Sequence, residues 1–314
     1  MQVHFKKIMP LSFKHSTPLM LEQHFHGAYG VDFNTASVDD IIGLSKKLVK
    51  NGIGGFFPTL VTDSVENIKK QIGIIKEASK KTDKDCAKIF GIHLEGIFLN
   101  PLKKGIHNSE HFMDLTIENY KKIEDEFIKI VTLAPELDKG LIDYLKNNGI
   151  KVQAGHCVGD DLSKVDGVTH IYNAMQGVMH RGKSTALSAL VNNQVYSEVI
   201  ADGVHVSDEA LGLLFKMKPD DKIILVSDAL PITYSDKKEV EFADSKIYYD
   251  GVKAISAEGT IAGSTTLLDK IVKILAKKNL FNPKYIENVY KYHNIKPFGE
   301  IVWDKDWNIL QTKI

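Results

Sequence analysis

An alternation of short apolar, β-rich runs with helical patterns is the feature that most constrains the fold of this chain. Such alternation is typical of βα units that build a parallel sheet. Eight runs can be counted, near Leu19–Gln23 and at Gly54–Thr59, Lys88–His93, Ile128–Leu133, Lys151–Ala154, Val168–Ile171, Glu198–Ala201 and Lys222–Val226. Eight strands with interleaved helices predict an α/β fold, a (β/α)8 TIM barrel. A doubly wound open sheet is the alternative, because counting strands does not separate the two.

Helix signals lie between most of these runs. Ser37-Val-Asp-Asp begins one helix with a capping-box pattern, and Gly52 ends it. Residues 64–80, 138–148 and 207–217 also carry apolar side chains at helical spacing.

Two further segments have the pattern of β-hairpins, Glu239–Ile261 and residues 299–310. We expect residues 1–12 to pair with the second hairpin, as a reduced β-sandwich remnant formed by the two chain ends. The chain is then divided into a barrel at 13–295 and a small β remnant at 1–12 plus 296–314.

Charge and composition argue against several classes of protein. Lys plus Arg and Asp plus Glu are 40 each in 314 residues, so the net charge is zero. That balance argues against a general nucleic-acid binder and a polybasic membrane-surface protein. No apolar run approaches the ~20 residues of a transmembrane helix, and no signal peptide is recognised. We therefore expect a cytoplasmic protein with Cys86 and Cys157 as free thiols.

Histidines and carboxylates follow most of the expected strands. In a barrel of this type, chemistry sits at the C-terminal ends of the strands. Six of the eight runs deliver such residues to that rim, namely His24 with His26, Glu95, His156, His170, His205 and Asp228. A single histidine or carboxylate at a strand end is more often a polar side chain with ordinary hydrogen-bond partners than a ligand. Together, imidazoles with one Glu and one Asp match the ligand chemistry of Zn²⁺ or Fe²⁺, so we expect a metal site.

The motifs around these residues follow one another in a recognisable order between residue 24 and about residue 270. They are Gly91-Ile-His-Leu-Glu-Gly with Lys103-Lys-Gly-Ile-His-Asn108, Ala154-Gly-His156, Thr169-His-Ile-Tyr-Asn-Ala-Met175 with Arg181, Ala201-Asp-Gly-Val-His205, Leu225-Val-Ser-Asp-Ala229 and Ala262-Gly-Ser264. In these motifs the chain resembles the N-acetylglucosamine-6-phosphate deacetylase family of the amidohydrolase superfamily. Family members carry a longer N-terminus before the first strand motif.

The resemblance implies a metal centre with one or two ions per subunit. Glu95, His156 and His170 match the family's main metal ligands. His24 and His26 match a pair that holds a second ion in some members, with Glu95 as the bridge.

The resemblance also implies catalytic and substrate-binding residues. Asp228 matches the catalytic aspartate, and His107 matches the histidine that helps polarise the acetyl carbonyl. The sugar-phosphate contacts are matched by Asn173, Ala174, Arg181 and His205. In the family this arginine reaches in from the neighbouring subunit, which implies a homodimer.

These roles imply hydrolysis of the acetamide of N-acetylglucosamine 6-phosphate to glucosamine 6-phosphate and acetate. A bound divalent metal, Zn²⁺ or Fe²⁺, lowers the pKa of its water to about 7. The metal-bound hydroxide is then the nucleophile, and Asp228 acts as general base and afterwards as general acid. His107 and the metal would stabilise the developing oxyanion.

Two other functions stay open. One is a related amidohydrolase that acts on another N-acyl sugar phosphate. A dihydroorotase-like or adenine-deaminase-like amidohydrolase is disfavoured, because such enzymes typically need a carboxylated lysine or a different strand-one and strand-four pattern, and the fourth expected strand ends in Thr132-Leu-Ala-Pro-Glu136 without a lysine. The other is a non-catalytic sugar-phosphate sensor, which loss of Asp228 or of the metal ligands would favour; none of them is missing.

Overall fold

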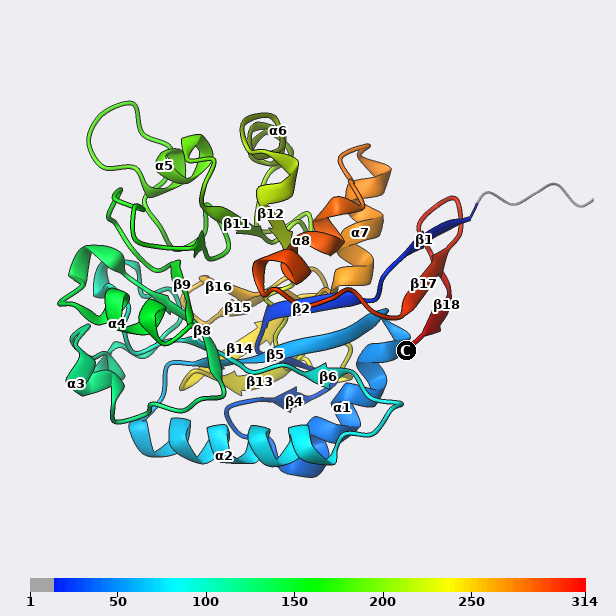
Figure 1. The fold of residues 1–314 in the computed structure, drawn as a ribbon, viewed down its shortest axis with the longest axis horizontal. Helices are drawn as coiled ribbons and strands as arrows, with labels where there is room; N and C mark the ends of the chain where they lie inside the picture. Colours follow the sequence, from blue (N-terminus) through cyan, green and yellow to red (C-terminus); the bar gives the residue numbers. More distant parts are fainter. Residues whose placement is uncertain (1–13) are drawn as a thin grey trace, which may run out of the picture.

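The computed structural model describes residues 14–314. The expected pairing of residues 1–12 with the C-terminal hairpin therefore lies outside the described residues. Figure 1 shows a central sheet surrounded by helices, and a separate small sheet at one end of the molecule.

Eight parallel strands form the central sheet, paired in the order β12-β11-β10-β9-β8-β7-β5-β2. In chain order they are β2 (Met20–Phe25), β5 (Ile53–Val61), β7 (Ile92–Glu95), β8 (Ile128–Leu133), β9 (Lys151–Ala154), β10 (Gly167–Val168), β11 (Tyr196–Val199) and β12 (Ile223–Leu225). Each expected run contributes one strand to this order, so the α/β class is confirmed. The third run, Lys88–His93, also contains a second short strand, β6 (Lys88–Ile89), which pairs with β5 before β7 begins.

The sheet is curled, but its strand pairing stops short of a closed ring. The edge strands β2 and β12 share no ladder within residues 14–314. The segments after them meet instead, because the N–H of Asp228 donates to the carbonyl of His24 at 2.9 Å. Helix α8 (Lys284–Tyr292) packs against both edges, and Asn288 Nδ2 donates to the carbonyl of Ile223 at 2.7 Å. The fold is thus a curled half-barrel of the TIM-like type, where eight strands predicted a complete ring.

The four helices that local signals predicted are present as α1 (Val38–Lys50), α2 (Val65–Lys81), α4 (Leu141–Asn147) and α6 (Asp208–Met217). Four others accompany them within residues 14–314, namely α3 (Ile117–Tyr120), α5 (Thr185–Val191), α7 (Leu268–Lys277) and α8, with 3₁₀ turns at Pro101–Lys103, Ser109–His111, Pro135–Leu137 and Asp220–Lys222. The capping box of α1 is formed. Ser37 Oγ accepts from the N–H of Asp40 at 3.2 Å, and the Asp40 carboxylate accepts from the N–H of Ser37 at 3.0 Å.

Antiparallel strands form the remaining sheets. The two chain ends contribute β1 (His15–Thr17), β17 (Glu300–Trp303) and β18 (Ile309–Lys313), so the hairpin expected at 299–310 is confirmed. The hairpin expected at 239–261 is part of a four-stranded meander of β13 (Glu239–Phe242), β14 (Ser245–Tyr249), β15 (Ala254–Ser256) and β16 (Ile261–Gly263). The strands β3 (Gly27–Ala28) and β4 (Val31–Asp32) pair only with each other.

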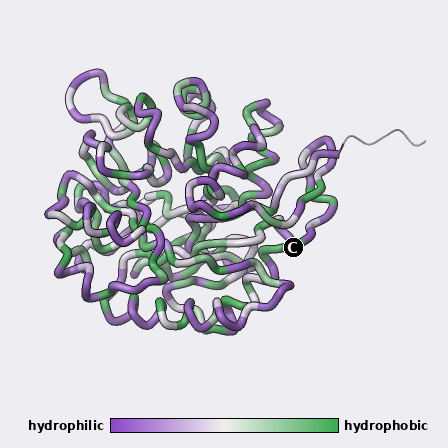
Figure 2. Tube along the Cα trace, in the orientation of Figure 1, coloured by the Kyte–Doolittle hydropathy of each residue, from purple (hydrophilic) through white to green (hydrophobic). Residues whose placement is uncertain are grey.

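The hydrophobic core lies between the central sheet and its helices. Helix α1 buries Ile41, Leu44 and Leu48, while its acidic and basic ends stay at the surface. Figure 2 shows hydrophobic segments through the centre and hydrophilic ones along the outer turns. None of the helices within residues 14–314 is long and apolar enough to cross a membrane.

Candidate active site

The C-terminal rim of the central sheet collects most of the side chains that the sequence singled out. A cavity of about 510 Å³ opens there. It is lined by His26, Glu95, His107, His156, His170, Asn173, Ala174, His205 and Asp228, among others. His24 lies fully buried beside these residues, whereas Arg181 is not part of the lining.

The Glu95 carboxylate lies at the centre of the site, at the end of β7. Its Oε1 is 2.9 Å from Nε2 of His170 and 3.3 Å from Nε2 of His156. Its Oε2 is 3.0 Å from Nε2 of His26 and 3.2 Å from Nε2 of His24. One carboxylate therefore faces two separate pairs of imidazoles, one with each oxygen.

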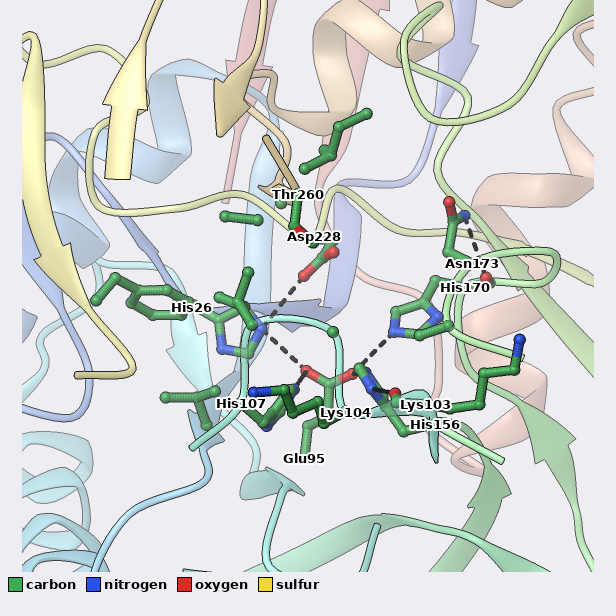
Figure 3. A pocket seen from close by; sticks show the side chains of 18 of the residues that line it. His26, Glu95, Lys103, Lys104, His107, His156, His170, Asn173, Asp228 and Thr260 are labelled. Atoms are coloured by element: carbon green, nitrogen blue, oxygen red, sulfur yellow. Dashed lines mark hydrogen bonds and ion pairs between the residues drawn. The ribbon is translucent and has the colours of Figure 1, made fainter. Parts of the chain in front are cut away.

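Asp228 completes the group on the β2 side. Its Oδ1 is 3.2 Å from Nε2 of His26 and 3.4 Å from Nε2 of His24. Figure 3 shows Asp228 above and Glu95 below, both facing the same ring nitrogen of His26, with His170 and His156 on the other side of Glu95. Asp228, which the sequence predicts to be catalytic, thus lies beside the histidines that the sequence predicts to be metal ligands.

Local backbone conformation helps to aim these side chains. His156, His170 and Asp228 have positive φ values of 48°, 32° and 50°. Non-glycine residues in this region each carry a cost of roughly 1–3 kcal/mol, and such strain clusters at functional sites. The backbone turns sharply at each of these strand ends, so that the side chain points into the rim.

Two motif glycines are required by close approach. A Cβ on Gly27, directly after His26, would lie 1.9 Å from the carbonyl oxygen of Val31. A Cβ on Gly96, directly after Glu95, would lie 2.5 Å from the backbone nitrogen of Thr62. The glycine after His26 and the glycine after Glu95 therefore let a neighbouring backbone segment approach closely.

The second ring nitrogens of the histidines point away from Glu95. Nδ1 of His156 pairs with the carbonyl of Lys103 at 2.8 Å, and Nδ1 of His26 pairs with the carbonyl of Thr59 at 3.2 Å. A carbonyl accepts a hydrogen bond, so each Nδ1 carries a proton and each Nε2 is the ring nitrogen that faces the site, where a cation could take the place of its proton. Metal-ligating histidines show this arrangement.

The donor set fits divalent cations in two groups that share Glu95. Glu95, His156 and His170 form one, with ligand atoms within 4.8 Å of one another. His24, His26, Glu95 and Asp228 form the other, within the same limit. Imidazole with carboxylate suits Zn²⁺ and Fe²⁺. We name these the first and second ion-binding groups.

Charges within the site shift the pKa values of its members. Burial alone would raise the pKa of Glu95, but the charge of His24 and hydrogen bonds from His156 and His170 hold it well below its usual range. Burial opposes protonation of His26, yet hydrogen bonds with Asp228 and Glu95 raise its pKa to about 9. The carboxylates of Glu95 and Asp228 therefore stabilise a positive charge in the space between them. Either protonated histidines or a bound cation can supply that charge.

His107 has the opposite shift. Burial and the nearby charge of His156 lower the pKa of His107 well below its usual range. Its Nδ1 lies 2.8 Å from Oγ1 of Thr62, and its Nε2 lies 4.0 Å from Oε2 of Glu95. A neutral imidazole is thereby held at the cavity wall, next to the first ion-binding group.

The residues expected to bind the sugar phosphate are only partly together. Asn173, Ala174 and His205 line the cavity, and Figure 3 shows Asn173 on the His170 side. Arg181 lies in an exposed loop ahead of α5 and does not line the cavity.

Sequence reasoning missed two parts of the site. The meander provides a wall of the cavity through Phe242 and Ile261. Glu198 lies beneath His24, with its Oε2 2.9 Å from Nδ1 of His24. A carboxylate at the start of the expected strand Glu198–Ala201 was an available signal, since a buried charge needs partners.

Comparison with known proteins yields relatives of one kind, although no family model matches the chain. The N-acetylglucosamine-6-phosphate deacetylase of Bacillus subtilis is 34% identical over 261 residues, which are 79% of this chain and 66% of that protein. The N-acetylgalactosamine-6-phosphate deacetylase of Escherichia coli O157:H7 is 26% identical over 294 residues, 90% of this chain and 78% of that protein. The chain spans just under two thirds of the length of the Bacillus subtilis relative.

Solved structures share the fold over almost the whole chain. The crystal structure of N-acetylglucosamine-6-phosphate deacetylase from Thermotoga maritima has a TM-score of 0.87 at 23% identity and covers 99% of this chain and 90% of its own. A Mycobacterium smegmatis deacetylase in complex with N-acetyl-D-glucosamine-6-phosphate has a TM-score of 0.86 at 22% identity, with 96% and 86% covered. In sequence and in fold, the chain is thus similar to N-acetylglucosamine-6-phosphate deacetylases.

Proposed function

We propose that this protein hydrolyses the acetamide of N-acetylglucosamine 6-phosphate to glucosamine 6-phosphate and acetate, with a divalent metal as cofactor. The observation that carries the proposal is the Glu95 carboxylate between two pairs of imidazoles, with Asp228 beside it at the cavity. The proposal treats the curled sheet as a (β/α)8 barrel at 13–295, with residues 1–12 and 296–314 as a β remnant.

Zn²⁺ or Fe²⁺ is the cofactor that we propose. The first ion-binding group would hold one ion and the second group another, with Glu95 common to both. A bound divalent cation supplies a Lewis acid for the amide carbonyl and lowers the pKa of water. All other steps below are carried by side chains of the chain itself.

Asp228 would move the proton. Its pKa lies below the usual range, because hydrogen bonding with His26 and the charge of His24 outweigh its burial. The carboxylate is therefore ready to accept the proton of the attacking water. It would then donate that proton to the departing amine nitrogen, which must be protonated before the C–N bond breaks.

His107 would act at the acetyl oxygen. Its ring is neutral and keeps one N–H, so it can donate a hydrogen bond without a full charge. A donor already in place at the developing oxyanion stabilises the transition state, often as the largest single contribution.

The phosphate would bind on the side of Asn173, Ala174 and His205. Burial opposes protonation of His205, but the hydrogen bond with Asp202 and its charge raise the pKa of His205. We propose that Arg181 of a second subunit supplies the remaining cation, so that the active form is a homodimer. A guanidinium pairs with a phosphate in bidentate fashion.

We also propose a cytoplasmic location. The free thiols of Cys86 and Cys157 and a phosphorylated sugar as substrate both favour a reducing interior.

A second candidate substrate is N-acetylgalactosamine 6-phosphate, because a relative at 26% identity is named for it. The two sugars are epimers with the same acetamide and phosphate. The same residues would therefore carry either reaction.

The test measures acetate release and metal content on one sample, purified without chelator. Both sugar phosphates, the unphosphorylated sugars and an Asp228→Asn variant are compared. We expect metal-dependent release from a phosphorylated sugar, reduced about 10²–10⁴-fold in the variant. Bound metal without turnover of either sugar phosphate would point to another N-acyl sugar phosphate or to a sensor. Absence of both after loading with Zn²⁺ or Fe²⁺ would refute the metal site.

A further inference from the structure

A third cluster of histidine and carboxylate side chains lies beneath the ion-binding groups. It contains His24, His93 and Glu198, all buried, with ligand atoms within 4.8 Å of one another. The ring nitrogens of His93 are both used, since Nδ1 pairs with the carbonyl of Gln23 at 2.9 Å and Nε2 with Oγ1 of Thr132 at 2.7 Å. This cluster is a closed hydrogen-bond network and needs a role other than holding a third ion.

Glu198 contacts both ion-binding groups from below. Its Oε2 is 2.9 Å from Nδ1 of His24 in the second group and 3.3 Å from the backbone nitrogen of His170 in the first. Its Oε1 accepts hydrogen bonds from the side-chain amides of Gln23 and Gln153. Four donors around one carboxylate fix its position in the interior.

This position decides which nitrogen of His24 faces the cavity. An ionised carboxylate only accepts hydrogen bonds, so Nδ1 of His24 carries the proton. Nε2 is then the ring nitrogen on the cavity side, 3.2 Å from Oε2 of Glu95 and 3.4 Å from Oδ1 of Asp228, where a cation could take the place of its proton. By contrast, Glu198 meets His170 at its backbone and not at its ring.

We propose that Glu198 is a positioning residue for the second ion: it holds His24 with Nε2 presented to the second ion-binding group. The inference rests on the proposed function only in that the rim binds divalent ions. Removing the carboxylate should weaken the second ion and spare the first, because only a ligand of the second group depends on Glu198 for its ring orientation.

The experiment compares Zn²⁺ binding by the full chain, its Glu198→Gln variant and a Glu136→Gln control. Glu136 also accepts from a backbone N–H, that of Val158 at 2.7 Å, and from a side-chain amide, that of Asn100 at 2.8 Å, but contacts no member of either group. Ions per subunit are measured by elemental analysis and stepwise affinities by competition with a chelator. Acetate release is recorded separately.

We expect two Zn²⁺ per subunit in the parent and in Glu136→Gln. In Glu198→Gln, one of the two ions should lose about 10–100-fold in affinity while the other keeps its affinity, because removing a partner behind a metal ligand usually has this effect on the ion that the ligand holds. If Glu198→Gln binds each of the two ions as tightly as the parent and Glu136→Gln do, the proposal is overturned. A parent that binds one ion, or an equal loss of both ions in Glu198→Gln, would also overturn it.

Nitrogen-15 NMR of the histidine rings tests the same point in the unaltered protein, should Glu198→Gln not fold. In the Zn²⁺-loaded chain, His24 should bind zinc through Nε2 and keep a proton on Nδ1. Zinc on Nδ1 of His24 would overturn the proposal. If both ions bind as expected and no acetate appears, the deacetylase function fails while the role of Glu198 stands.

Discussion

His205 shows how a single carboxylate adjusts an imidazole at the cavity. Asp202 Oδ2 lies 2.8 Å from Nδ1 of His205, and Asp202 Oδ1 accepts from the N–H groups of Val204 and His205. Both side chains are nearly inaccessible to solvent. Asp202 thereby favours a positive charge on the His205 ring, at the position where we propose that the phosphate binds.

The Asp202→Asn variant should lose that charge at neutral pH. The raised pKa of His205 favours a protonated ring in the parent at pH values above the ordinary pKa of about 6.5, whereas in the variant burial would lower the pKa of the same ring. At pH 7.5 we expect KM for the sugar phosphate to rise roughly 10-fold, the weight of one charged hydrogen bond. The difference in KM should narrow as the pH falls, because the ring in the variant then gains its proton as well.

The measurement is KM as a function of pH, with an Asp161→Asn variant at an exposed position as control. A KM for Asp202→Asn that equals that of the parent across the range would show that His205 does not act through its charge.

Among the elements, helices α5 and α6 are joined by one buried lysine. Lys218 ends α6, and its Nζ donates to the carbonyls of Ala189 at 2.7 Å and Asn192 at 2.6 Å at the end of α5. Burial, with a smaller contribution from the charge of Lys222, lowers the pKa of Lys218 to about 8. The free backbone carbonyls at the end of α5 thus receive hydrogen bonds from a side chain at the end of α6.

This lysine should make stability depend on pH in the alkaline range. Between pH 8 and about 10.4 the unfolded chain holds a proton on Lys218 that the folded chain has released, so the free energy of unfolding should rise with pH. Relative to Lys218→Met, the parent should gain more than ~1.4 kcal/mol across this window, the equivalent of one pKa unit.

Urea unfolding at several pH values, at constant metal loading, checks this prediction. Lys216→Met, at an exposed position on the same helix, serves as the control and should run parallel to the parent. A parallel curve for Lys218→Met would contradict the lowered pKa.

At the scale of the whole molecule, the loop ahead of α5 and the cavity rim leave apolar side chains uncovered. Val178 and Met179 are 48% and 42% exposed, and Leu102 at the rim is 79% exposed. Figure 1 shows this loop projecting from the body of the molecule at the upper left. A second subunit would cover such groups and bring Arg181 to a neighbouring cavity.

Mixing two inactive variants tests whether Arg181 acts across subunits. In a mixed dimer of Arg181→Ala and Asp228→Asn chains, one site would keep its own Asp228 and receive an intact Arg181 from the other chain. After unfolding and refolding together, random pairing should restore about a quarter of the parent activity. If the mixture stays as inactive as either variant alone, Arg181 acts within its own subunit or not at all.

Local sequence signals were sufficient for most elements. The capping box of Ser37 and Asp40 and the apolar spacing in α2 depend on neighbours within a few residues, and both helices form as expected. The pairing of the two edge strands of the central sheet could not be predicted in this way. Whether β2 pairs with β12 depends on sheet curvature and on α8 packing at the seam, and neither leaves a local pattern.

The sequence by itself determined the order of strands and helices, the ligand types and the rim on which they gather, because strand direction sends successive strand ends to one edge. Only the tertiary structure decided how those groups face each other. The two oxygens of Glu95 meet different pairs of histidines, and Glu198 reaches His24 across 174 positions of sequence. Such contacts depend on distances between remote strands, which packing sets and residue spacing along the chain does not contain.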